Sequence, residues 1–262
     1  MTEGMRAMLY KVALWADIAE TAEDEKEKKL FERRVDLLIP ICKAYCSDHG
    51  FRVTEYAVQT LGGYGYIAEY PMEQYLRDAK IASIYEGTNG IQALDLLGRK
   101  LGMKGGMVFM QYMQDLAAAV EQAKGVERLA GVAAGLEKSQ AKLAETVMGF
   151  QGAMASGNSE AVWPVLSATP FLEAMGHVTV AWFLADMAVM AQGKLDALCA
   201  DKGVDAADRK AYRAFLGEND EAKFLDGKVQ SAIWFANNVL PEADGIFKSI
   251  GTKDLSALQV VL

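Results

Sequence analysis

Apolar residues recur at intervals of three and four along most of the chain, and this spacing is the strongest constraint on its fold. The four clearest stripes are Met5, Met8, Leu9, Val12, Trp15, Ala16 and Ala19; Phe31, Val35, Leu38, Cys42 and Tyr45; Leu129, Val132, Leu136, Leu143 and Val147; and Leu225, Val229, Ala232, Ile233, Ala236 and Leu240. The strict alternation of half-buried strands is almost absent, and only five of the 262 residues are proline. The sequence therefore predicts an all-α protein.

Three features interrupt the helical pattern. Pro40 falls inside the second stripe, and its missing N–H suits the first turn of a new helix better than the middle of one. The mixed-charge run at residues 23–29 is predicted to be a solvated helix end or connection. The glycine-rich segment at residues 101–106 predicts a boundary near residue 104, which divides the chain into helical domains at 1–104 and 105–262.

Composition narrows the class of protein and its compartment. The net charge of -8 argues against a dedicated nucleic-acid binder, which needs clustered Lys and Arg. Three cysteines imply no disulfide framework and fit a reducing cytosol. The N-terminal residues lack the blocks of a signal peptide, and the most apolar stretch, residues 180–191, lies between Gly176 and Gly193 and is too short to span a bilayer. We expect a cytoplasmic protein without a membrane segment.

The least helical part of the first domain is residues 59–66 (QTLGGYGY). Its glycines at 62, 63 and 65 are expected to end a helix and to leave backbone N–H groups uncovered by side chains. Two interpretations of this segment stay open. It is a simple helix C-cap, or it is a place where a phosphate or pyrophosphate approaches the backbone closely.

A second segment places a carboxylate between two helices. A helix is predicted from Pro71 to about Ile84, and Thr88 or Asn89 is predicted to cap the next one. Glu86 then lies in the turn between them, after an apolar pair and before Gly87. A carboxylate held in a partly apolar pocket suits a general base, whereas the alternative is an ordinary exposed glutamate.

The remaining metal or nucleophile candidates are interpreted as structural. Cys42 and Cys46 share a helical face, but no nearby His or third Cys completes a zinc set, so both are expected to be buried as small hydrophobic residues. His49, at an expected helix irregularity, and His177, beside an apolar run, have no nucleophile at a telling spacing. We therefore predict no metal site.

Three motifs occur in a fixed order: QTLGGYGY at 59–66, EYP at 69–71 and RDAKIASIYEGT at 77–88. Together they resemble the C-terminal domain of the acyl-CoA dehydrogenases. The continuation at 89–106, NGIQALDLLGRKLGMKGG, is similar to the long bacterial branch of that family, of the 3-methylmercaptopropionyl-CoA dehydrogenase type, which carries an extra helical C-terminal region. The resemblance is strongest over residues 3–104, and residues 105–262 fit the extra region in length and helicity.

The resemblance implies roles for five residues. Glu86 matches the family's catalytic base, which removes the α-proton of an acyl-CoA thioester while a hydride passes to the flavin, and its backbone N–H matches a donor to the thioester oxygen. Gln59, Gly62 and Gly63 match positions that hold the adenosine diphosphate part of FAD, usually that of the neighbouring subunit. Thr88 matches a residue that touches FAD within the active-site subunit.

The resemblance also implies further domains and partner proteins. Family members carry a helical N-terminal domain and a β-rich middle domain, so we expect the chain to be a C-terminal part of a longer enzyme. A homodimer or tetramer and an electron-transfer flavoprotein are the expected partners. Two alternatives are an acyl-CoA oxidase and, for the isolated chain, a non-catalytic helical oligomerisation module.

Overall fold

The computed structural model describes residues 1–157 and 159–261, and these ranges contain helices and connecting turns but no strand. The all-α prediction is therefore confirmed. The α-helices are α1 (Thr2–Thr21), α2 (Glu25–Leu61), α3 (Gly63–Tyr66), α4 (Met72–Ile81), α5 (Asn89–Asp95), α6 (Met107–Lys124), α7 (Ala130–Ser156), α8 (Trp163–Leu166), α9 (Ala168–Lys202), α10 (Arg209–Glu218), α11 (Asp220–Asn238) and α12 (Leu240–Ile250). Four short segments complete the fold: a π-helical turn η1 (Leu96–Lys100) and the 3₁₀ turns η2 (Glu127–Leu129), η3 (Ser159–Val162) and η4 (Ser256–Gln259).

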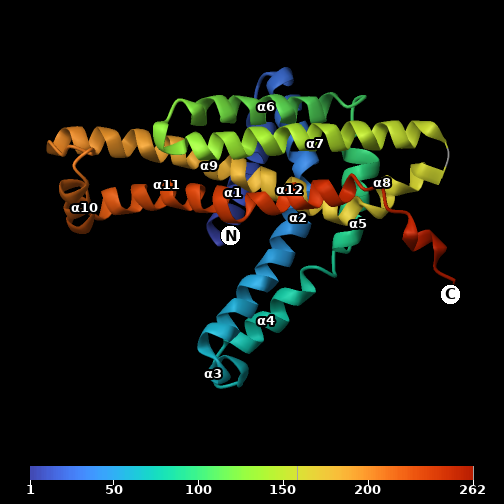
Figure 1. The fold of residues 1–262 in the computed structure, drawn as a ribbon, viewed down its shortest axis with the longest axis horizontal. Helices are drawn as coiled ribbons and strands as arrows, with labels where there is room; N and C mark the ends of the chain where they lie inside the picture. Colours follow the sequence, from blue (N-terminus) through green and yellow to red (C-terminus); the bar gives the residue numbers. More distant parts are fainter. Residues whose placement is uncertain (158, 262) are drawn as a thin grey trace.

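Helix α9 is the central element of the body. It contacts α1, α2, α5, α6 and α7 as well as α11 and α12, and the long helices α6, α7, α9, α11 and α12 run roughly along one axis (Figure 1). By length and composition α9 could cross a membrane, but 78% of its most apolar 18-residue window is buried inside the protein. Burial of that kind is expected of a core helix.

The extent of α9 corrects one prediction. The apolar stretch at 180–191 was expected to be too short to span a bilayer, yet the helix that contains it, α9, continues through both flanking glycines for 35 residues. Glycine lowers helix propensity by about 1 kcal/mol, which tertiary packing offsets. At Gly176 the missing side chain itself permits packing, because a Cβ there would lie 2.2 Å from a ring carbon of Tyr45.

Helix α2 corrects a second prediction, because it runs unbroken through Pro40 for 37 residues. A proline inside a helix removes one backbone hydrogen bond and costs about 3 kcal/mol. Pro40 is buried, and the neighbouring Leu37, Leu38 and Ile41 are packed into the core. This burial on both sides of the proline offsets the loss and keeps the helix continuous.

Most predicted stripes lie in the core. All five residues of the stripe from Leu129 to Val147 are buried, whereas Leu9 and Ala16 of the first stripe are exposed. Leu240 is buried but begins α12 instead of ending α11. The hydrophobic core continues across residues 101–106, which form turns between η1 and α6, so the proposed domain division near residue 104 stays a prediction.

The charged run at residues 23–29 is largely exposed, as predicted. It contains the connection between α1 and α2, where the side chain of Asp24 accepts a hydrogen bond of 2.9 Å from the backbone N–H of Lys26 and so caps α2. This run therefore begins a helix and buries nothing.

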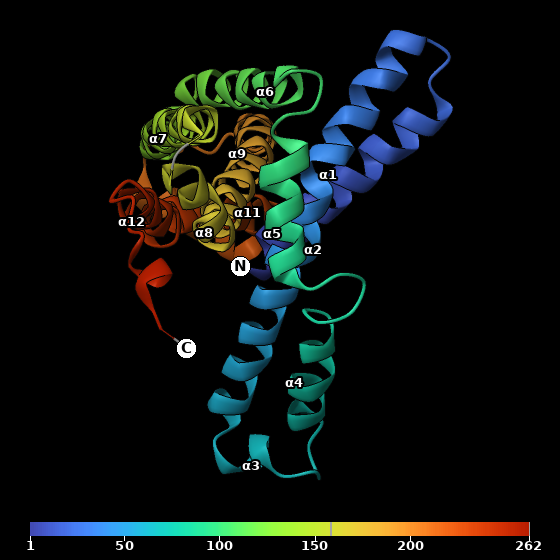
Figure 2. The ribbon, with the colours of Figure 1, turned by 90° about the vertical axis from the view of Figure 1, so that its right-hand side faces the viewer.

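The C-terminal part of α2, together with α3 and α4, projects from the body, and we call this projection the arm (Figures 1 and 2). Helix α4 packs along α2, and the Lys80 ammonium lies 5.1 Å from the centre of the Phe51 ring. No residue of α4 is buried. Large apolar side chains are exposed along the arm, namely Tyr56, Leu61, Tyr64, Tyr66, Ile67, Tyr70, Tyr75 and Ile81.

Candidate active site

The glycine-rich segment forms the tip of the arm. Helix α2 ends at Leu61 as predicted, and Gly62 has φ +58° while its N–H donates to the carbonyl of Gln59 at 3.1 Å. The positive φ explains a glycine at position 62. Gly63 has an ordinary helical conformation, and a Cβ added at either Gly62 or Gly63 would meet nothing within 4 Å. The backbone at 62–63 is therefore open to a ligand from outside the chain.

Gly65 has a different explanation. It is buried, and a Cβ at this position would lie 2.5 Å from the carbonyl oxygen of Val58 and 2.9 Å from its Cα. Gly65 is thus required for α3 to pack against the last turns of α2, and it needs no ligand to account for it.

These surroundings predict different effects of alanine on stability at Gly65 and at Gly63. Gly65→Ala is expected to lower the free energy of unfolding by about 1–3 kcal/mol, because the added methyl meets backbone atoms that cannot move aside. Gly63→Ala is expected to change it by less than about 1 kcal/mol, since the site is open and helical. Urea denaturation measures both, and equal stabilities of the two variants would contradict this assignment.

Glu86 lies in the turn between α4 and α5, as predicted, although α4 ends at Ile81 instead of Ile84. Its backbone is left-handed, with φ +54°, which is uncommon for a residue other than glycine. Within residues 1–157 and 159–261, the backbone N–H of Glu86 donates no hydrogen bond. The partly apolar pocket expected around the carboxylate is not formed by the described residues, because Glu86 is exposed and Ile84 and Tyr85 are more than half exposed.

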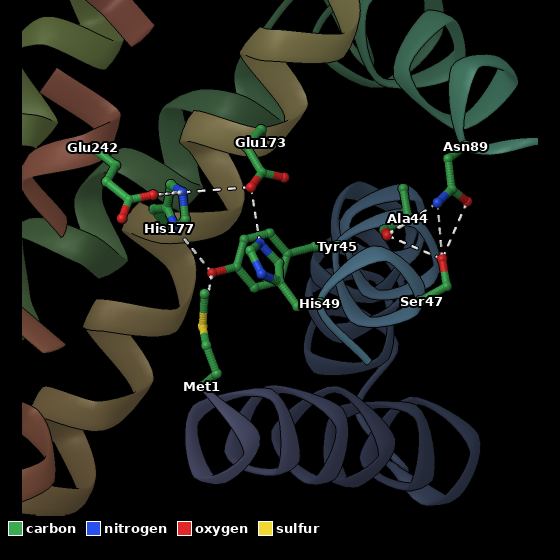
Figure 3. Close-up of polar contacts among 9 residues, drawn as sticks. All are labelled: Met1, Ala44, Tyr45, Ser47, His49, Asn89, Glu173, His177 and Glu242. Atoms are coloured by element: carbon green, nitrogen blue, oxygen red, sulfur yellow. Dashed lines mark hydrogen bonds and ion pairs between the residues drawn. The ribbon is translucent and has the colours of Figure 1, made fainter. Parts of the chain in front are cut away.

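Side chains from α2 and α5 hold this turn in place. The Lys43 ammonium donates to the carbonyl of Gly87 at 2.7 Å and to Oδ1 of Asn89 at 2.8 Å. The Asn89 amide in turn donates to the carbonyl of Ala44 at 3.2 Å and to the hydroxyl of Ser47 at 2.9 Å (Figure 3). Strained backbone persists where its surroundings determine it, and here α2 supplies those surroundings. Lys43 was not singled out from the sequence, and Asn89 was named only as a possible helix cap, because their contacts join residues more than forty positions apart.

The five predicted site residues form two separate groups in one chain. Thr88 caps α5 by accepting a hydrogen bond of 3.3 Å from the N–H of Ile91, and it lies beside Glu86 at the base of the arm. Gln59, Gly62 and Gly63 lie at the tip, at the opposite end of α4 (Figures 1 and 2). All five are exposed. One chain therefore brings Glu86 and Thr88 together but separates them from Gln59, Gly62 and Gly63.

Cys42 and Cys46 pack as small hydrophobic residues, as predicted. Cys42 and Cys46 are half-buried on α2 and pack against the hydrophobic core. Burial raises the pKa of each thiol to about 12, so both stay protonated at neutral pH and are poor metal ligands.

The two histidines are arranged differently from the expectation. His49 lies within the continuous helix α2 and not at an irregularity, and its ring centre is 5.6 Å from that of His177 in α9. Both are buried. Only the packing of α2 on α9 brings them together, so no local sequence signal could have found the pair.

Two family descriptions match this chain. Residues 2–101 match the family described as acyl-CoA dehydrogenase, C-terminal domain, and residues 109–260 match the one described as acetyl-CoA dehydrogenase C-terminal like. The second match covers more than half of the chain.

Named relatives and a solved structure agree with these matches. The chain is 32% identical to a butyryl-CoA dehydrogenase of Syntrophomonas wolfei over 98% of its own length, and 31% identical to the 3-methylmercaptopropionyl-CoA dehydrogenase of Ruegeria pomeroyi over 92%. It spans only 39% and 37% of those two proteins. The structure of Caenorhabditis elegans ACDH-11 in complex with C11-CoA has the same fold, with a TM-score of 0.65 at 16% identity over 89% of this chain and 33% of that one. By fold and by family match, the chain belongs to the acyl-CoA dehydrogenase family.

Proposed function

We propose that this chain acts as the helical C-terminal part of an FAD-dependent acyl-CoA dehydrogenase, in which Glu86 is the catalytic base. The observation that carries the proposal is the turn at Glu86, whose left-handed backbone is held by Lys43 and Asn89. In the described part of the chain, its exposed carboxylate and its N–H make no hydrogen bond. Acyl-CoA is the substrate class, in keeping with the names of the relatives.

Glu86 has two roles in such a reaction. Its carboxylate removes the weakly acidic α-proton of the acyl thioester, a step that needs close alignment of base and substrate. Its backbone N–H, which has no partner among the described residues, is a donor for the thioester oxygen, on which negative charge develops as the proton leaves. Because the chain leaves Glu86 exposed, the walls that exclude water come from outside the described residues.

The residues that match FAD-binding positions fit a cofactor in two places. The open backbone at Gly62 and Gly63 permits close approach of a pyrophosphate, and Gln59 lies exposed one turn before it. Thr88 lies beside the base. When bound, FAD supplies the acceptor for the β-hydride. The separation of the two groups within one chain supports a site shared between two subunits. The resemblance to the family adds an electron-transfer flavoprotein as the proposed external partner.

A second function, helical oligomerisation by the chain alone, is favoured by the arm. Its exposed tyrosines and aliphatic side chains form more apolar surface than isolated exposed residues would, and such surface commonly marks an interface. We propose that the arm packs against another subunit or domain in the assembled protein. This role is compatible with catalysis and distinguishable from it.

A titration of the purified chain with FAD, followed by visible absorbance and with the molecular mass recorded alongside, tests both functions. A saturable shift of the flavin band, weakened by about 2–10-fold in Gln59→Ala through the loss of one hydrogen bond, is the expected result for a cofactor site. A stable dimer without any flavin shift would instead support the assembly function for the isolated chain. A monomer that binds no flavin would contradict both assembly by the chain alone and a cofactor site formed without the rest of the enzyme.

A further inference from the structure

A cluster of histidine and glutamate side chains, in which both histidines are buried, brings together residues of α2, α9 and α12 away from the arm (Figure 3). Nε2 of His49 is 2.8 Å from Oε1 of Glu173, and Nε2 of His177 is 3.5 Å from the same oxygen. Oε2 of Glu242 lies 3.7 Å from Nε2 of His177. Each of His49, Glu173 and His177 thus offers a ligand atom, and these atoms lie within 4.8 Å of one another.

One atom of this cluster lacks a hydrogen-bond partner. Nε2 of His177 is buried and makes no hydrogen bond within residues 1–157 and 159–261. Leaving such a group unpaired costs about 1–3 kcal/mol, so its placement calls for an explanation. The two nearest carboxylate oxygens lie beyond hydrogen-bonding reach, although both face this nitrogen.

The other nitrogen of His177 contacts a tyrosine. Nδ1 lies 2.9 Å from the Tyr45 hydroxyl, which also contacts the sulfur of Met1 at 3.6 Å. In the tautomer that carries its proton on Nδ1, the ring donates to the Tyr45 oxygen and leaves a lone pair on Nε2. Nε2 then presents a lone pair toward two carboxylates, an arrangement that is stable with a cation between them.

We propose that His49, Glu173 and His177 bind one zinc ion and that the exposed Glu242 side chain moves in as the fourth ligand. Zinc bonds to imidazole nitrogen and carboxylate oxygen are about 2.0–2.2 Å long, so neighbouring ligands of a tetrahedral ion lie about 3.3–3.5 Å apart. The two contacts of His177 are already close to this spacing. The His49–Glu173 pair is closer, and zinc would replace its direct hydrogen bond and separate the two atoms by about a further 0.5 Å.

Charge and surroundings also suit a divalent cation. Two carboxylates balance the charge of the ion, while the exposed Arg52 contributes one opposing positive charge near Glu173. The hydrogen bond from Nδ1 of His177 to Tyr45 orients the ring in the way that outer-sphere partners orient zinc-bound histidines. The Glu242 side chain is 61% exposed, which provides a route from solvent.

The position of the ion gives it a structural role. His49 belongs to the segment matched at residues 2–101, whereas Glu173, His177 and Glu242 belong to the segment matched at 109–260. Zinc at this point would join α2 of the first segment to α9 and α12 of the second. The role does not depend on the proposed dehydrogenase activity, because these residues lie apart from Glu86 and the glycine turn.

Zinc titration of the metal-free chain, with any affinity tag removed, tests this site directly. The background is low because the chain has two histidines in total, both in the cluster. In competition with a chromophoric zinc chelator we expect one zinc per chain with a Kd below about 1 μM. We also expect zinc to raise the midpoint of thermal unfolding, and a chelator to reverse that rise.

Variants decide whether the ion lies in this cluster. His49→Gln and Glu242→Gln are each expected to weaken zinc binding at least about 10–100-fold and to remove the thermal shift. Cys46→Ser is the matched control on α2 and should bind zinc like the unmodified chain. Since Glu242 is largely exposed, Glu242→Gln decides the question if His49→Gln fails to fold. No zinc uptake by the unmodified chain, unchanged binding in both cluster variants, or loss of binding in Cys46→Ser would overturn the proposal.

Discussion

Glu86→Gln is expected to lower the turnover of the enzyme that carries this sequence by about 10²–10⁴-fold, because an amide cannot accept the α-proton. Gln has the same shape as Glu, and the turn is held through Lys43 and Asn89 rather than through the Glu86 carboxylate. FAD content and molecular mass should therefore stay unchanged. The measurement is steady-state oxidation of butyryl-CoA, chosen because two relatives are named butyryl-CoA dehydrogenases.

Glu20→Gln provides the matched control for this experiment. Glu20 is an exposed glutamate on α1, outside both groups of site residues. The turnover of the Glu20→Gln variant should therefore equal that of the unmodified enzyme. If Glu86→Gln retained full turnover, Glu86 would not be the base. If the variant lost its flavin together with its activity, the effect would be on cofactor binding instead of proton removal.

Gly176→Ala is expected to give the largest loss of stability among single methyl additions in α9. A Cβ at Gly176 would lie 2.2 Å from Cδ2 and 2.9 Å from Cγ of Tyr45, a ring that is itself fully buried between α2 and α9. The two helices would have to move apart, so we expect the free energy of unfolding to fall by about 1–3 kcal/mol or more. Chemical denaturation followed by circular dichroism measures this change.

Gly193→Ala is the control within the same helix. Gly193 is exposed, and a Cβ there would meet nothing within 4 Å. Alanine is the better helix former, so this variant should gain about 0.5–1 kcal/mol. Glycine to alanine would then raise the free energy of unfolding at one position of α9 and lower it at another. A gain of similar size at both positions would show that helix propensity, and not the contact with Tyr45, sets the stability.

Much of this architecture could be predicted from local patterns. The spacing of apolar residues predicted helices because a side chain on a helix shares its face with neighbours three and four positions away. The turn at Glu86, the end of α2 at Leu61 and the cap at Thr88 were also predicted, since each depends on a few adjacent residues. The motifs around Gly62 and Glu86 were enough to indicate the family to which the chain belongs.

Other features depend on contacts between distant residues, and only the tertiary structure decided them. Helix α2 continues through Pro40 because the residues around it are buried, and α9 continues through Gly176 because Tyr45 packs there. The exposure of Glu86 depends on which surfaces the fold leaves uncovered. His49 and His177 meet because two helices cross, which no sequence period encodes. Local sequence determined which helices form and where most of them end, whereas packing between helices decided how far they run and which side chains they bring together.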